Sequence, residues 1–160
     1  MKKLAGFIAV ALGVVGVNYF MDAKRDESGA LVSAGNIDAF AIRVGDCFND
    51  ASSSSVGDEA SVTGVHGVPC SQPHDNEVYA VFDVDLPAFP ADGAMADIAF
   101  ESCHERFEAF VGRDYPSSAL DILTLYPSPE SWRHNDREVI CAVYDVNLSK
   151  LEGSVQGRAL

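Results

Sequence analysis

The chain has 160 residues, a formal net charge of −13 and 48% hydrophobic residues. This length fits one domain with short extensions. The charge is uneven, because residues 36–160 hold 21 acidic and seven basic side chains. Phosphate backbones and anionic lipid head groups repel a domain this acidic. We therefore expect no nucleic acid as a partner.

The N-terminal segment has the form of an export signal. Lys2 and Lys3 precede residues 4–21, an uncharged and largely apolar run that is followed at once by charged residues. The run is just long enough to cross about 30 Å of hydrocarbon as a helix, and small residues at cleavage spacing are poorly placed around it. We expect residues 1–21 to be an uncleaved signal anchor. It would pass once through the cell membrane and hold the domain outside. The alternative is a signal peptide and a secreted product.

The next residues change in composition. Residues 22–36 are charged and then rich in Gly, Ser and Ala, which is typical of a flexible tether. The folded domain is expected at residues 37–157. Alternating or continuous apolar patterns predict five strands, and the last is apolar on both faces, as in a covered central strand. The predicted strands are 40–44, 62–68, 77–84, 120–126 and 138–146, with a loop at 51–57 and a polar tail at 147–160.

One helix is predicted between Asp92 and Gly112. Asp92 is a suitable N-cap, and Gly112 is a suitable C-terminal stop. Apolar residues recur between them at spacings of four and three, which predicts one buried face. The sum is an α+β domain, with a small antiparallel sheet of about four or five strands and one main helix packed across it. The predicted buried face consists of Ala96, Phe100, Cys103, Phe107 and Phe110.

The four cysteines indicate disulfides, because exported chains meet an oxidising compartment. Cys103 lies on the apolar face of the helix and Cys141 lies within the last strand, so packing brings them together. Cys47 ends the first predicted strand and Cys70 precedes the 77–84 strand. Antiparallel pairing of these strands would bring both to one end of the sheet. We predict Cys47–Cys70 and Cys103–Cys141. Zinc is the competing interpretation, but only Cys70 and His74 have ligand spacing, so we expect no metal and no cofactor.

Several short strings follow one another in a fixed order, and the ordered set resembles the septum formation domain family of actinobacterial envelope proteins over residues 40–157. The resemblance implies an exported or membrane-anchored domain linked to septation, without established catalytic activity. The family tends to have Gly before the Asp-Arg pair, where this chain has Asn135. Asn tolerates a left-handed backbone, so we expect the turn to be kept. The strings are Val44-Gly45-Asp46-Cys47-Phe48, Val68-Pro69-Cys70-Ser71-Gln72-Pro73-His74-Asp75, Glu77-Val78, Trp132 with Asp136-Arg137, and Val139-Ile140-Cys141.

Four residues are candidates for binding. His74 and Asp75 lie in a turn after Cys70, where we favour structural hydrogen bonding over ligand contact. Arg137 opens the last strand near Trp132, and we favour a structural ion pair with an internal carboxylate. Trp132 is interpreted as a core residue, with an exposed stacking patch shared with Tyr126 as the alternative.

The sequence contains no recognisable catalytic constellation. There is no G-x-S-x-G string, and 21 acidic side chains make any chosen carboxylate pair arbitrary. We expect a non-catalytic extracytoplasmic envelope protein that acts through protein or cell-wall contacts. Cell division is the implied process, and envelope or division proteins are the implied partners. The alternative is a small-ligand or metal-binding domain around His74, Trp132 and Arg137. A third interpretation is a cell-wall hydrolase.

Overall fold

The computed structural model describes residues 22–50, 64–91 and 93–160. The predicted anchor at residues 4–21, the predicted loop at 51–57 and the predicted N-cap Asp92 lie outside the described residues. Within the described ranges, no helix is long and apolar enough to cross a membrane.

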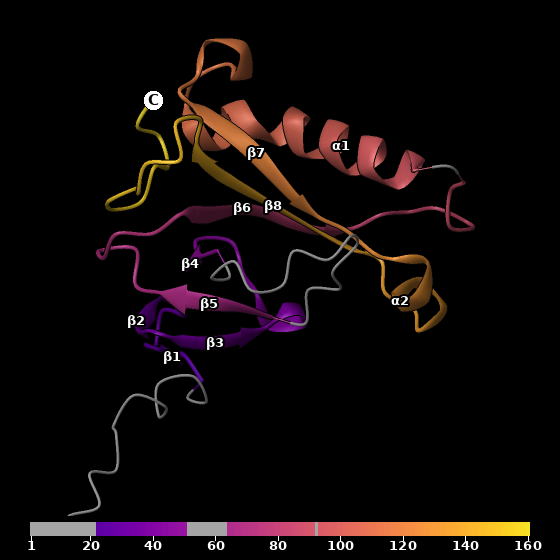
Figure 1. Cartoon of the computed structure of the whole chain (residues 1–160), viewed down its shortest axis with the longest axis horizontal. Helices are drawn as coiled ribbons and strands as arrows, with labels where there is room; N and C mark the ends of the chain where they lie inside the picture. The colour runs from indigo at the N-terminus through magenta and orange to yellow at the C-terminus, as the bar shows by residue number, and fades with distance from the viewer. Residues whose placement is uncertain (1–21, 51–63, 92) are drawn as a thin grey trace, which may run out of the picture.

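A six-stranded antiparallel sheet forms the centre of the domain (Figure 1), in the spatial order β3-β5-β4-β6-β8-β7. The long strand β8 pairs with β6 on one side and β7 on the other, as its doubly apolar pattern predicts. A separate two-stranded pair, β1 (Lys24–Arg25) and β2 (Leu31–Ser33), lies near one edge. The strands of the main sheet are β3 (Gly35–Asp38), β4 (Cys47–Asn49), β5 (Gly64–Val68), β6 (Asn76–Asp83), β7 (Leu120–Leu125) and β8 (Glu138–Asp145).

The main helix, α1 (Ala94–Val111), follows Gly93 and ends at Gly112, both with a left-handed backbone. The predicted C-terminal stop is confirmed. The predicted buried face is right for Cys103 and the two phenylalanines after it, but wrong in the first two turns. There Met95 and Ala99 are buried, whereas Phe100 is 38% exposed. The sequence offers two apolar stripes at helical spacing, one that begins with Ala96 and Phe100 and one that begins with Met95 and Ala99. Both continue through Cys103 and the two later phenylalanines, and only packing against the sheet selects between them.

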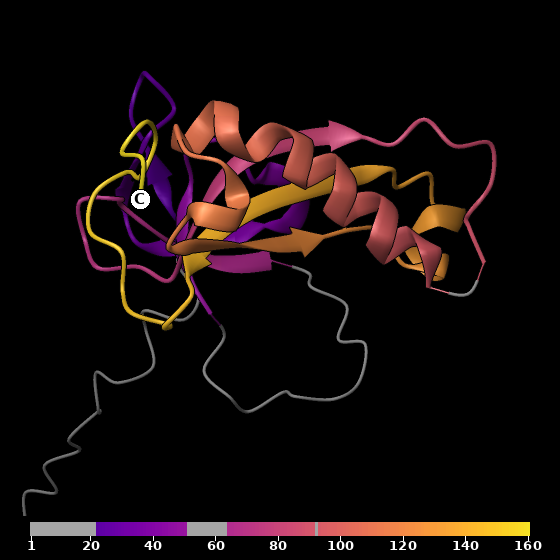
Figure 2. The same ribbon diagram turned by 90° about the horizontal axis from the view of Figure 1, so that it is seen from above.

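Both faces of the central strands are covered. Figure 1 shows α1 above β7 and β8, and β3 and β5 below them, while Figure 2 shows α1 lying across the sheet. The helix-side core includes Phe107, Val139 and Val143. The core on the other side joins Leu31 and Ile37 to the inner strands. The α+β class with one main helix is confirmed.

A bulge in β6 adjusts which residues face the helix. The register with β8 shifts between Val78 and Ala80. Val78 faces the second core, whereas Tyr79 and Ala80 both pack in the helix-side core. The Tyr79 hydroxyl donates to the backbone oxygen of Cys103 at 2.8 Å. This buried hydrogen bond ties β6 to the middle of α1.

The structure contains the two predicted disulfides, Cys47–Cys70 and Cys103–Cys141. They close loops of 23 and 38 residues, which stabilise the fold by about 3 and about 4 kcal/mol in the chain-entropy model. Cys103 and Cys141 meet where α1 packs on β8, as the helix-on-sheet argument predicts. Cys47 begins β4 instead of ending a strand.

The strand predicted at residues 40–44 is wrong. Residues Ala39–Ala41 form a short 3₁₀ helix whose N-cap, Asp38, accepts a hydrogen bond from the Phe40 N–H. Phe40 is 68% exposed, so its apolar side chain does not mark a buried strand here. The positive φ of Gly45 then turns the chain into β4.

Residues 22–36, predicted to be a flexible tether, contribute strands to the fold. They contain β1, β2 and the start of β3, and β3 pairs with β5. This is also why the sheet has six strands, with two more in the small pair, instead of four or five. Gly, Ser and Ala composition indicates flexibility only where no distant partner binds the segment. Here Arg25 reaches Asp46, and Leu31 is buried in the second core.

The C-terminal residues, predicted to be a polar tail, also pack against the domain. Leu151 and Val155 are buried in the helix-side core. The backbone of Leu151 pairs with that of His74. A segment with few apolar residues can still dock when each of them meets an existing core surface.

Candidate functional site

His74 is fully buried in the turn before β6. Its Nδ1 lies 2.8 Å from the backbone oxygen of Gln72, and its backbone N–H and C=O both bond to Leu151. A carbonyl partner requires the proton on Nδ1. Among the described residues, Nε2 has no hydrogen-bond partner. These contacts fit the structural role that the sequence favours for His74.

Asp75 connects three segments. Its carboxylate accepts a hydrogen bond from the backbone N–H of Asp50 at 3.0 Å and forms an ion pair with Lys150 at 2.7 Å. Lys150 also donates to Asn49 at 2.8 Å. Asp75 therefore fixes the end of β4 against the C-terminal segment, and its contacts are structural.

Trp132 and Arg137 stack on each other just before the start of β8. Trp132 lies in α2 (Pro129–Arg133) and is 8% exposed. The guanidinium of Arg137 lies 3.5 Å above the Trp132 ring and donates to the backbone oxygens of Trp132 and Asp136. Within the described part of the chain, Arg137 forms no ion pair, so the carboxylate partner favoured by the sequence is replaced by a cation–π contact.

The turn before Arg137 has the backbone that the sequence predicts. Asn135 has φ of +68°, in the left-handed region where the family tends to have Gly. Trp132 is a core residue, as predicted, whereas Tyr126 is 45% exposed and does not share a surface patch with a buried Trp132.

The four candidates do not meet in one site. β6 and β8 pair from Asn76 with Tyr144 to Asp83 with Glu138. His74 precedes the first of these ends and Arg137 lies beside the second. Seven residue steps along a strand correspond to about 23 Å. A single ligand site built on His74, Trp132 and Arg137 is therefore contradicted by the structure.

Asp46 and Glu77 are buried acids whose partners the sequence analysis did not identify. Asp46 receives the guanidinium of Arg25 through contacts of 2.5 and 2.7 Å. This ion pair raises the pKa of Arg25. Glu77 accepts hydrogen bonds from the Ser154 hydroxyl and the Val155 N–H. Both acids lie within the strings that carry the family resemblance, but no local pattern indicates their distant partners.

Glu77 also lies beside a disulfide. Its carboxylate and the sulfurs of Cys47 and Cys70 lie within 4.8 Å of one another, which has the outline of a metal site. The two sulfurs are bonded to each other, and metal binding requires deprotonated free thiols. With the disulfide intact, this cluster does not offer a thiolate ligand set.

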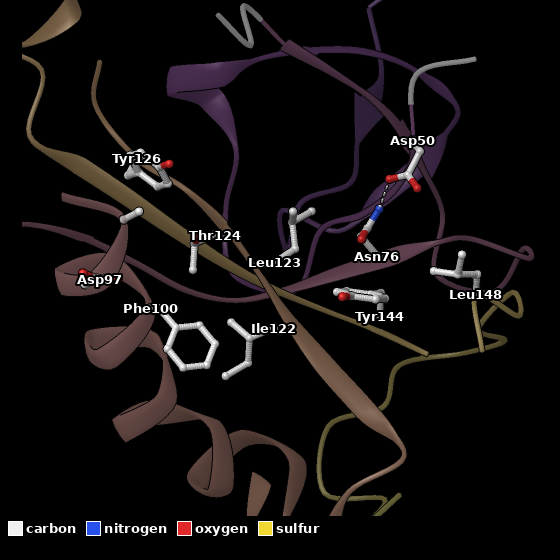
Figure 3. A pocket seen from close by; sticks show the side chains of 11 residues that line it. Asp50, Asn76, Asp97, Phe100, Ile122, Leu123, Thr124, Tyr126, Tyr144 and Leu148 are labelled. Carbon is white, nitrogen blue, oxygen red and sulfur yellow. Dashed lines mark hydrogen bonds between the residues drawn. The ribbon is translucent and has the colours of Figure 1, made fainter. Parts of the chain in front are cut away.

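A concavity of about 580 Å³ lies at the free edge of β7 (Figure 3). We call it the edge groove. Sequence patterns do not predict it, because it depends on which strand stands last in the sheet. Two aspartates, three aromatic rings and several aliphatic side chains line it. The lining residues are Asp50, Asn76, Ala96, Asp97, Phe100, Ile122, Leu123, Thr124, Tyr126, Tyr144 and Leu148.

A carboxylate beside the edge groove is held by two tyrosines. Asp121 accepts hydrogen bonds from Tyr115 at 2.6 Å and Tyr144 at 3.1 Å, and its own Oδ1 accepts the Ile122 N–H. The bond to Asp121 raises the pKa of Tyr115 to about 12. Burial opposes ionisation of Asp121, but these hydrogen bonds outweigh it and lower its pKa. Asp121 is therefore held as a charged acceptor at neutral pH.

A second concavity of about 420 Å³ lies beside α2. Its lining includes Phe40, Glu130 and His134 but neither Trp132 nor Arg137. It therefore does not restore a site around the stacked pair.

Comparison with known proteins identifies a family. The sequence profile described as "Septum formation" matches residues 44–159. Comparison with curated proteins and with solved structures finds no match. The matched range covers most of the chain and contains all four cysteines, from β4 to the C-terminal segment. The chain therefore belongs to the septum formation family.

Proposed function

We propose that the protein is a non-catalytic envelope component of septum formation. Its folded domain works outside the cytoplasm, is held to the membrane through residues 4–21, and acts through protein or cell-wall contacts during cell division. The observation that carries the proposal is family membership combined with two disulfides in a domain this small. Disulfides persist in oxidising compartments, which supports a position outside the cytoplasm.

The contacts of the candidate residues support an interaction role over catalysis. His74, Arg137 and Glu77 each make hydrogen bonds within the fold, and they lie in different parts of the domain. An enzyme needs ionisable groups that converge on a reacting atom. The edge groove instead offers an open strand edge, apolar side chains and two carboxylates, which suits contact with another molecule.

The location is tested with a β-lactamase reporter fused after Leu160 of the full chain. We expect intact cells to hydrolyse an impermeant substrate, and deletion of residues 4–21 to abolish this activity. A fusion that is active only after lysis would overturn the proposal, because both the disulfides and the envelope role depend on export. Intact mass before reduction gives an independent reading, since two disulfides lower the mass by about 4 Da.

The link to division is tested in living cells with a fluorescent fusion of the full chain. We expect fluorescence to concentrate at septa, and depletion of the protein to delay or misplace them. Uniform fluorescence together with normal septation after depletion would contradict a role in division. This outcome would leave the location itself standing, because the reporter measures it separately.

A further inference from the structure

β7 is the last strand of the main sheet, and its outer edge has no strand partner among the described residues. The Val146 N–H donates to the Ala119 carbonyl oxygen, so these opposite residues form a hydrogen-bonded pair. In an antiparallel ladder every second residue of a strand bonds to the same neighbour, and this pair shows which residues of β7 bond to β8. Residues 121, 123 and 125 bond to β8, and their even-numbered neighbours direct backbone groups outward. Leu120, Ile122 and Thr124 therefore present the free edge.

Side-chain oxygens accept hydrogen bonds from the outward N–H groups only in the first half of this edge. The Leu120 N–H donates to the Ser118 hydroxyl at 3.0 Å, and the Ile122 N–H donates to the Asp121 carboxylate at 2.8 Å. In the described ranges, the outward N–H of Thr124 has no such acceptor. Native edges are usually blocked along their length. The second half of β7 is thus left able to pair with another strand.

The edge groove borders this open half and extends along the sheet to Tyr144 and Asn76, which lie level with Asp121 in the register. Figure 3 shows Phe100 and Ile122 on the helix side of β7, and Leu123 with Tyr144 toward the other side. Side chains of an added strand point alternately to the two faces of a sheet. Those on one face would pack on Phe100, and those on the other would pack on Leu123. The groove therefore has walls for both sets of side chains as well as free backbone groups.

The charge of the groove selects the occupant. Asp50 and Asp97 line it, and none of the Lys or Arg residues that the structure describes does. Asp50 is fixed in place, because the buried amide of Asn76 donates to it at 2.7 Å. A second copy of this chain would bring like charges together across β7, in a protein of net charge −13. A basic segment matches the groove.

We propose that the open half of β7 binds an extended, Lys- or Arg-containing segment of a partner protein, which adds to the sheet as a further strand. Backbone hydrogen bonds to Thr124 supply the register, and Asp50 and Asp97 supply the preference for basic residues. This deepens the proposed function, on which it rests for the compartment where the partner is met.

The test is a titration of the full chain, isotope-labelled and kept in neutral detergent, with a blocked peptide Lys-Val-Thr-Val-Thr-Lys. NMR follows the amide signals. We expect the largest shifts at residues 122–126, with slower hydrogen exchange at the Thr124 N–H. The same peptide with Glu in place of Lys, or N-methylated on alternate residues, should bind at least about tenfold more weakly.

Two variants locate the site. Thr124→Pro removes the outward donor without removing a bond to β8, and should weaken binding about tenfold. Asp97→Lys should weaken binding about threefold to tenfold at low salt, with a smaller effect at high salt. Glu108→Lys is the matched control, because it makes the same charge change on an exposed part of α1 outside the groove, and should bind as the unmodified chain does.

Several results would overturn the proposal. These are equal binding of the N-methylated peptide, shifts centred outside β7, or a peptide-free dimer through β7. Binding of a neutral chitin oligosaccharide at Tyr126 that survives Thr124→Pro, without peptide binding, would assign the groove to glycans instead. If Thr124→Pro fails to fold, the N-methylated peptide still tests the backbone hydrogen bonds, because it is used with the unmodified chain. None of these outcomes bears on the reporter that tests location, so the two proposals fail separately.

Discussion

The two disulfides stabilise regions of opposite character. Cys103–Cys141 joins α1 to β8, with both cysteines fully buried among apolar residues such as Phe107. Cys47–Cys70 lies at the start of β4, beside the carboxylate of Glu77. Near it, Asp46 receives the guanidinium of Arg25. One region is an apolar core, and the other is a set of buried polar contacts around a disulfide.

This difference determines how strictly the amino-acid sequence must be chosen to form each region. Apolar burial is non-directional and scales with area, so many sequences with the right periodicity form it. Buried polar contacts need a particular partner in a particular place. Here the partners are 21 residues apart for Arg25 and Asp46, and 77 for Glu77 and Ser154. Substitutions that remove buried volume should therefore lower the stability of the apolar region most. In the polar region, stability should fall most when one partner of a buried contact is removed.

Phe107→Ala should give the largest loss of stability. Phe107 is fully buried and packs edge-on against Tyr79 and Tyr115. Its truncation should lower the free energy of unfolding by about 3–5 kcal/mol, with little dependence on salt. Urea unfolding measures this. Phe100→Ala is the control, because Phe100 is partly exposed and should lose no more than about 1 kcal/mol. Equal losses would contradict the observed choice of buried face.

Asp46→Asn should destabilise the polar region by about 2–3 kcal/mol. The substitution leaves the Arg25 guanidinium without its anionic partner in a largely buried place, and that charge then lacks compensation. Arg25→Met gives the other side of a double-mutant cycle. We expect the double variant to lose less than the sum of the two single losses, by at least about 1 kcal/mol. Additive losses in urea unfolding would show that the pair contributes no coupling.

The same contrast explains what the sequence could reveal. The positions of α1, β6 and β8 follow from apolar periodicity, and the Cys103–Cys141 pair follows from α1, β8 and the expected compartment. The Cys47–Cys70 pair is also correct, although its prediction rests on a strand at residues 40–44 that the structure does not contain. The strands of residues 22–38 and the docking of Leu151 could not be found this way. Their stabilising partners are Asp46, β5 and His74, which no local pattern links to them.

The candidate site shows the same limit. His74, Asp75, Trp132 and Arg137 stand out by residue type, but strand register separates them into two ends of the β6–β8 pair. The edge groove depends on β7 being the last strand, and strand order in a sheet is not contained in the apolar pattern. Only Tyr126, a candidate for an exposed patch, pointed toward it.

Gly67→Ala should test whether β3 belongs to the fold. A Cβ on Gly67 would lie 2.3 Å from Cδ1 of Ile37, closer than any side chains approach. The crowding between β5 and β3 should cost about 1–2 kcal/mol, measured by urea unfolding. Ile37→Val removes the nearest atom, so the double variant should recover part of the loss. An unchanged stability for Gly67→Ala would mean that residues 35–38 do not pack on β5.

Asp121→Asn should have a smaller, pH-dependent effect in the helix-covered half. The folded state lowers the pKa of Asp121, so the carboxylate stabilises the fold above its unfolded pKa and loses this contribution as pH falls through the folded value. The variant should be less stable by under about 1 kcal/mol at neutral pH. In acid the two proteins should converge. Unfolding midpoints from acid to neutral pH would show this, and a constant gap would refute it.

Glu138→Gln should act in the opposite direction. Burial, followed by the nearby charges of Asp136 and Asp83, raises the pKa of Glu138 in the folded state. Protonated Glu138 therefore favours the fold below its unfolded pKa, and this advantage is lost as pH rises through the folded value. At neutral pH the charged form is a small cost, which Gln removes, so the variant should be slightly more stable there and no more stable in acid. The same pH series measures both carboxylates. A variant less stable than the parent at neutral pH would show that Glu138 stabilises its end of β8 by contacts that outweigh the repulsion.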